Sequence, residues 1–186
     1  MLRKCVPFIL LACLAVAGCW QSRARPYRDA IGVQPFAAGA VTTTDQDGRV
    51  EHYMLRRIER GRYRLTPSDR GRDFGQGIEL GLFPLPGAPG RVLVLEMAML
   101  SFHSGDDNLR YYGLLVLTGK DSAREIVPRC GKDARAARVS GVTKDRAGIC
   151  TFPDRASLEK SLLALWKSGK KPETALRLER AIGSPR

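Results

Sequence analysis

The chain has 186 residues, and its 31 lysines and arginines against 19 aspartates and glutamates give a formal net charge of +12 at pH 7. Apolar residues make up 44% of the sequence and aromatic residues 7%, which excludes an intrinsically disordered chain. The length suits one domain with a hydrophobic core of its own.

Residues 1–20 contain the three parts of a secretory signal peptide. Arg3 and Lys4 form a basic start, residues 6–17 form an apolar core, and small residues close it. The closing string, Val16-Ala17-Gly18-Cys19, resembles the lipobox of bacterial lipoprotein precursors. The resemblance covers only this part of the chain and assigns no family to the remainder.

The resemblance implies that residues 1–18 are removed as a signal peptide and that Cys19 then carries a diacylglyceryl thioether and an amide-linked fatty acid such as palmitate. Two or more acyl chains anchor a protein stably in a membrane. In Gram-negative lipoproteins an aspartate after the modified cysteine favours the inner membrane, whereas this chain has Trp20 there. We therefore expect a lipoprotein in the periplasmic leaflet of the outer membrane, with a net charge of +10 once Arg3 and Lys4 are lost.

Three alternatives to this cleavage remain open. Ala15-Val16-Ala17 fits an ordinary signal peptidase site, which would release a soluble protein. Leu10-Leu11-Ala12-Cys13 is a second lipobox-like string, but cleavage there leaves only residues 6–12 as the apolar core. An uncleaved anchor is disfavoured, because the uncharged stretch of residues 5–20 is shorter than the roughly 20 residues that span a bilayer.

Residues 19–37 are predicted to be a basic, flexible tether, because they hold three arginines, two prolines and few apolar residues. Residues 38–186 are predicted to form a single β-rich periplasmic domain. Short stretches between turn residues predict strands at residues 40–44, 49–58, 61–66, 78–82, 91–101, 109–118 and 126–127. Apolar and polar residues alternate in those at 61–66 and 78–82. The strands at 91–101 and 109–118 are almost continuously apolar, which favours central positions covered on both faces.

The C-terminal part of the chain changes period. Leu158, Leu162, Leu165 and Trp166 lie at i, i+4, i+7 and i+8, which predicts one apolar face of a helix that Gly169 would end. Residues 174–182 fit either an edge strand or a helix, and we favour the strand. The elements together predict an α+β fold, mainly an antiparallel β meander of about five to seven short strands covered by the C-terminal helix.

The lipobox also bears on the five cysteines. If Cys5 and Cys13 leave with the signal peptide and Cys19 carries lipid, Cys130 and Cys150 are the two that remain. Two thiols in an exported domain are expected to form a disulfide, which would stabilise the fold by about 3 kcal/mol. Neither a Cys-x-x-Cys motif nor zinc-type spacing is present, so we predict no redox or metal pair.

One loop brings together residue types used in catalysis. His103, Ser104 and Asp106 supply a base, a nucleophile and an acid, but the members of a catalytic triad normally come from separate segments. The chain also has no Gly-x-Ser-x-Gly motif. We therefore predict a non-enzyme with no metal and no cofactor, and keep an envelope hydrolase using these three residues as an alternative.

The basic charge provides the remaining functional indication. Arg60, Arg62 and Arg64 recur at a period of two, which predicts a basic stripe on one face of a strand. Such a stripe is either a solvated face or a contact site for phospholipid, lipid A phosphates or acidic polymer. The export signal excludes nucleic acid as the partner. The leading hypothesis is a lipid-anchored binding module that contacts an anionic envelope component or an envelope protein, and a carrier of an apolar ligand is a further alternative.

Overall fold

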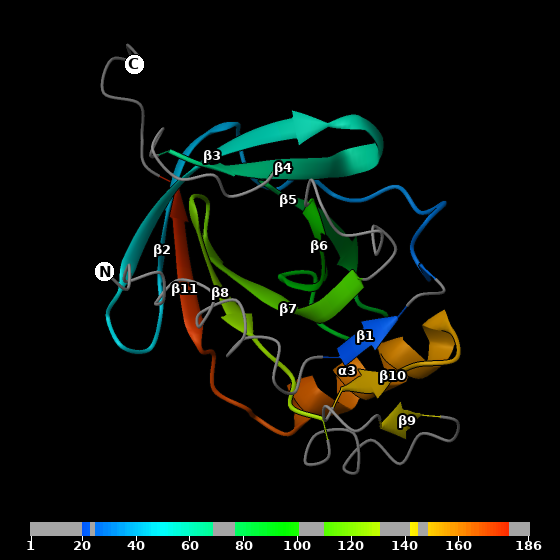
Figure 1. Ribbon diagram of the computed structural model, residues 1–186. Helices are drawn as coiled ribbons and strands as arrows, with labels where there is room; N and C mark the ends of the chain where they lie inside the picture. Colours follow the sequence, from blue (N-terminus) through cyan, green and yellow to red (C-terminus); the bar gives the residue numbers. More distant parts are fainter. Residues whose placement is uncertain are drawn as a thin grey trace, which may run out of the picture.

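Eight strands form a closed antiparallel barrel (Figure 1). The computed structural model describes residues 20–22, 25–68, 77–100, 110–130, 142–144 and 149–178. The barrel strands in chain order are β2 (Gly39–Thr44), β3 (Val50–Ile58), β4 (Arg62–Pro67), β5 (Gly77–Pro84), β6 (Val92–Leu100), β7 (Arg110–Gly119), β8 (Ser122–Ile126) and β11 (Thr174–Leu178). Each strand from β2 to β7 pairs with the next strand of the barrel.

The last strand closes the barrel. β11 pairs with β8 on one side and with β2 on the other, so the first and last barrel strands become neighbours. The predicted fold class, an open meander of five to seven strands covered by a helix, is therefore wrong. The strand predicted within residues 174–182 is present as β11, but it pairs on both sides and is no sheet edge.

The barrel buries one core in its interior. Alternate positions along the strands supply its apolar side chains. Its buried members are Phe36, Val41, Leu55, Tyr63, Leu65, Leu80, Leu82, Leu93, Leu95, Leu115, Ala123 and Leu178. Because the barrel closes on itself, this core needs no helix to cover it.

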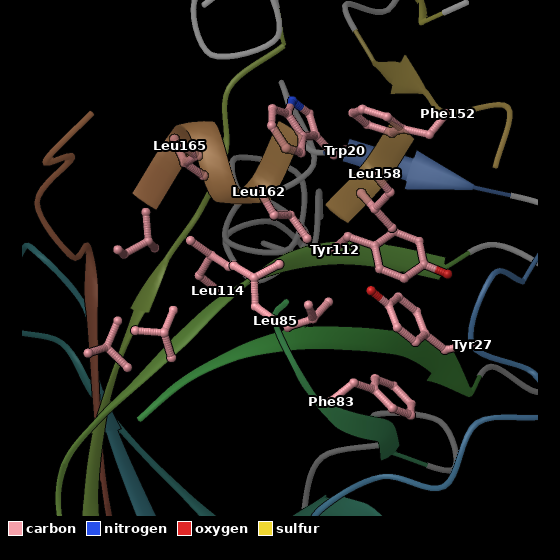
Figure 2. Close-up of a cluster of buried hydrophobic side chains, with 14 of the residues drawn as sticks. Trp20, Tyr27, Phe83, Leu85, Tyr112, Leu114, Phe152, Leu158, Leu162 and Leu165 are labelled. Atoms are coloured by element: carbon pink, nitrogen blue, oxygen red, sulfur yellow. The ribbon is translucent and has the colours of Figure 1, made fainter. Parts of the chain in front are cut away.

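A second core lies on the outer face of the barrel, under the helix α3 (Arg155–Lys167), as Figure 2 shows. Leu158, Leu162 and Leu165 of the helix are buried there, as predicted. Asp154 accepts a hydrogen bond from the backbone N–H of Ser157 at 2.7 Å and so caps the start of the helix.

The two cores explain why β6 and β7 are apolar almost throughout. On β6, Leu93 and Leu95 belong to the interior core, and Val92 and Val94 belong to the outer core. The prediction that these strands are covered on both faces is confirmed.

The N-terminal segment is built into the domain. β1 (Trp20–Ser22) pairs with β7 and with β10 (Cys150–Thr151), and β10 in turn pairs with β9 (Thr143–Lys144). Trp20 and Tyr27 are fully buried, and Phe36 is 3% exposed. Where the structure describes residues 19–37, they therefore do not form the predicted tether, because three aromatic side chains fix this arginine-rich segment to the barrel.

Cys130 and Cys150 form the predicted pair, with Sγ atoms 2.02 Å apart. This disulfide joins the chain after β8 to β10. Across the described ranges, no helix has the length and apolar character needed to cross a bilayer.

Candidate functional site

A polar hollow of about 120 Å³ opens on the outer face of the barrel. Of the residues that the structure describes, six line it, and all six are charged: Arg25, Arg28, Arg62, Glu79, Glu96 and Arg110. Two of them precede β2, and the others lie on β4, β5, β6 and β7. We call this site the arginine pocket.

The pocket is built on one row of residues that crosses four strands. Arg62 on β4 pairs with Gly81 on β5, and Gly81 pairs with Glu96 on β6. Glu96 pairs with Tyr112 on β7. Paired residues share a face of the sheet, so this row points outward while neighbouring leucines point into the barrel.

Glu96 is the buried acid of the row, with 2% of its surface exposed. Its Oε1 lies 2.5 Å from Arg62 Nη1, and its Oε2 accepts a hydrogen bond from the Tyr112 hydroxyl at 2.9 Å. Burial raises the pKa of Tyr112, and the charge of Glu96 raises it further, so the hydroxyl stays protonated and keeps donating. The carboxylate is thus paired on both oxygens, as a buried charge requires.

Arg62 holds together several parts of the pocket. Its Nη1 lies 3.4 Å from Glu79 Oε1, and its Nη2 donates to the Tyr27 carbonyl oxygen at 3.0 Å. The guanidinium also lies over the Phe83 ring, 5.4 Å from its centroid. The Arg62 side chain is only 11% exposed, so its charge serves to join the strands of the pocket wall and is little available to a ligand.

Tyr27 fixes the turn that carries Arg25 and Arg28. Its ring stacks on Phe83 with centroids 4.4 Å apart, and its hydroxyl donates to Glu159 of α3 at 2.9 Å. Within the turn, the Arg28 backbone N–H donates to the Arg25 carbonyl oxygen at 2.9 Å. The two arginines therefore line the pocket from a segment that is anchored between the barrel and the helix.

The pocket carries an excess of positive charge. Four arginines and two glutamates line it within the described ranges, and their formal charges sum to +2. Arg62 forms an ion pair with Glu96, and Arg110 Nη2 lies 3.9 Å from Glu79 Oε1. Guanidinium groups offer planar pairs of N–H donors that match carboxylate and phosphate oxygens. The arrangement is chemically suited to holding a small oxyanion.

Of the three arginines predicted as one basic stripe, Arg62 and Arg64 share the outer face of β4, whereas Arg60 lies outside the strand. Only Arg62 belongs to the pocket, and it is nearly buried. Arg60 lies in the β3–β4 turn with a left-handed φ of 55°, and its Nη1 is 3.8 Å from Asp29 Oδ1. Arg64 is exposed on β4, beside Glu79 in the register.

Other predicted site residues lie outside the residues that the structure describes. These are Cys19, the proposed lipid attachment site, and His103, Ser104 and Asp106, the alternative catalytic group. Among the residues with described placement, no cluster of three or more His, Cys, Asp or Glu side chains could hold a metal ion.

Sequence reasoning missed most of the pocket. Glu96 offered the best available signal, because it is a single carboxylate within the apolar run of residues 92–98. Arg25 and Arg28 were assigned to the tether, and Glu79 and Arg110 lie near strand ends where charge is ordinary. The chain matches no protein-family model, no curated protein and no solved structure.

Proposed function

We propose that the protein is a lipid-anchored binding protein of the bacterial envelope, and that its arginine pocket captures a carboxylate or phosphate group. The observation that carries this proposal is that four arginines and two glutamates of the described residues line one small hollow on the outer face of a closed barrel. The lipobox-like string before Trp20 supports the envelope location and the anchor.

The outer pocket suits a ligand better than the barrel interior does. In the described part of the chain, twelve buried apolar side chains belong to the interior core. The pocket instead gathers guanidinium groups at a surface that solvent reaches, and its 120 Å³ is below the several hundred Å³ of sites for drug-sized ligands. The proposed ligand is therefore one anionic group, free or at the end of a larger molecule.

Calorimetric titration of the detergent-extracted mature protein with inorganic phosphate and with acetate tests this function. Binding should weaken as salt rises, because the attraction is electrostatic. The variant Arg28→Gln should raise the dissociation constant about tenfold, since a charge-assisted hydrogen bond is worth about 1.5–3 kcal/mol. The matched control Arg64→Gln removes an equal charge outside the pocket. No binding at low salt, or an equal loss in both variants, would refute the proposal.

A further inference from the structure

The position of Trp20 determines how an anchor at Cys19 would hold the barrel. Trp20 is fully buried, and its ring lies 4.9 Å from that of Phe152. Its backbone pairs with Tyr112 on one side and with Cys150 on the other. The residue next to the proposed lipid attachment site is thus a fixed part of the domain.

Almost no flexible chain would separate an acyl anchor on Cys19 from the barrel. Consecutive Cα atoms are about 3.8 Å apart, so an acyl anchor on Cys19 would be only one such step along the chain from the buried Trp20. A flexible tether of 18 residues would instead have allowed an average reach of roughly 20–25 Å. Such an anchor would hold the domain directly on the membrane surface, with the β1 end of the molecule towards it.

The arginine pocket lies close to this attachment point. The row Arg62, Gly81, Glu96 and Tyr112 continues through β1, because Tyr112 pairs with Trp20. Glu96 is two strands from Trp20, which corresponds to about 10 Å. Ser22, two residues after Trp20, pairs with the pocket residue Arg110.

We infer that the barrel rests directly on the leaflet that holds its acyl chains, and that the arginine pocket binds the phosphate of a lipid headgroup in that leaflet. The inference rests on the proposed function, because it assumes an acylated Cys19 and an anion-binding pocket. It adds to the proposed function that the bound anion is the phosphate of a membrane lipid. A fixed short distance gives headgroup phosphates a high effective concentration at the pocket, which a free anion at low concentration cannot match.

The test compares the lipidated protein with a variant that carries ten Gly/Ser residues inserted between Cys19 and Trp20. Both are placed in nanodiscs of phosphatidylcholine with phosphatidylglycerol, and native mass spectrometry counts the phosphatidylglycerol molecules retained after gentle release. The insertion gives a root-mean-square reach of about 17 Å and lets the barrel turn away from the surface. Intact mass confirms acylation of each sample.

Retention of phosphatidylglycerol should fall about fivefold on linker insertion and to a similar level in Arg28→Gln, while Arg64→Gln retains it. The phosphate dissociation constant in detergent should stay within twofold in the linker variant, because the pocket itself is unchanged. Unchanged lipid retention in the linker variant, or in Arg28→Gln when its phosphate binding has weakened as expected, overturns the headgroup inference and leaves the proposed function standing. Loss of phosphate binding in the unaltered protein refutes the proposed function, and an unmodified Cys19 overturns the direct contact with the leaflet.

Discussion

Arg62 on β4 reaches Glu96 on β6 across the intervening strand β5, and the two side chains meet at 2.5 Å. Gly81 is the residue of β5 that lies between them in the register. A Cβ atom at this position would lie 3.0 Å from Arg62 Nη1 and 2.7 Å from Phe83 Cε2. The missing side chain of Gly81 therefore makes the ion pair possible.

Replacing Gly81 by alanine should displace Arg62 or Phe83 and lower the free energy of unfolding by about 1–3 kcal/mol, the range for overpacked sites. Urea denaturation of the variant and the unaltered protein measures the difference. Gly90→Ala is the matched control, because a Cβ there meets nothing within 4 Å. Equal stabilities for Gly81→Ala and Gly90→Ala would contradict this account.

The Arg62–Glu96 pair should be costly to break from one side. Glu96→Gln replaces the ion pair of the nearly buried Arg62 with a contact to a neutral amide. We expect the free energy of unfolding to fall by about 3 kcal/mol. The double variant Arg62→Met/Glu96→Gln should lose less than the sum of the two single changes. A double-mutant cycle by chemical denaturation gives the coupling energy, and strict additivity would show that the pair does not interact.

Glu125 on β8 should make stability depend on pH. Burial raises its pKa to about 7 from the ordinary 4.5, and the charge of Glu173 adds to the shift. Between pH 4.5 and 7 the folded state binds more protons than the unfolded state does. The free energy of unfolding therefore falls as pH rises through this range, and the charged Glu125 is a penalty to the folded state above pH 7.

Glu125→Gln removes this penalty and should raise the free energy of unfolding by about 2 kcal/mol at pH 8, with almost no gain at pH 4. Thermal or urea unfolding at the two pH values measures the difference. Glu59→Gln, at an exposed position in the β3–β4 turn, controls for the change of net charge. A stabilisation by Glu125→Gln that is equal at both pH values would exclude the titration of this carboxyl group as its cause.

The disulfide should help to hold β1 in place, because Cys150 pairs with Trp20 in the register. The variant Cys130→Ser/Cys150→Ser should lose about 3 kcal/mol of stability in the chain-entropy treatment. Hydrogen exchange should report faster exchange at the amides of β1 and β10, whereas those of β3 and β4 should change only with global stability. A uniform increase across all strands would argue against a local link between the disulfide and β1.

Local patterns in the sequence predicted local structure well. The alternation along residues 61–66 and the spacing of Leu158, Leu162 and Leu165 correspond to β4 and α3, because side-chain periodicity follows directly from backbone geometry. The pairing of Cys130 with Cys150 was predicted because only two cysteines remain once the signal peptide and Cys19 are set aside. Each of these features depends on residues close in sequence or on a choice between very few partners.

Barrel closure and the pocket depend on contacts that no local pattern encodes. Val41 pairs with Leu178, although nearly the whole domain separates them in sequence. Nothing in the residue pattern of either strand indicates which strand it pairs with. The arginines at positions 25 and 28 indicated a solvated tether, while the buried Tyr27 between them fixes the turn. The row that joins Arg62 to Glu96 became visible only when β4, β5 and β6 were placed in register.

The place of β11 also has a consequence for the order of folding. A chain that ends before Thr174 lacks the strand that pairs with both β2 and β8, and it retains two open edges with unmatched backbone groups. Contacts between the two ends of a domain form slowly, because a long loop must be ordered before they contribute. We therefore expect the barrel to close late, and truncation at residue 173 to yield an aggregating, seven-stranded sheet instead of a smaller barrel.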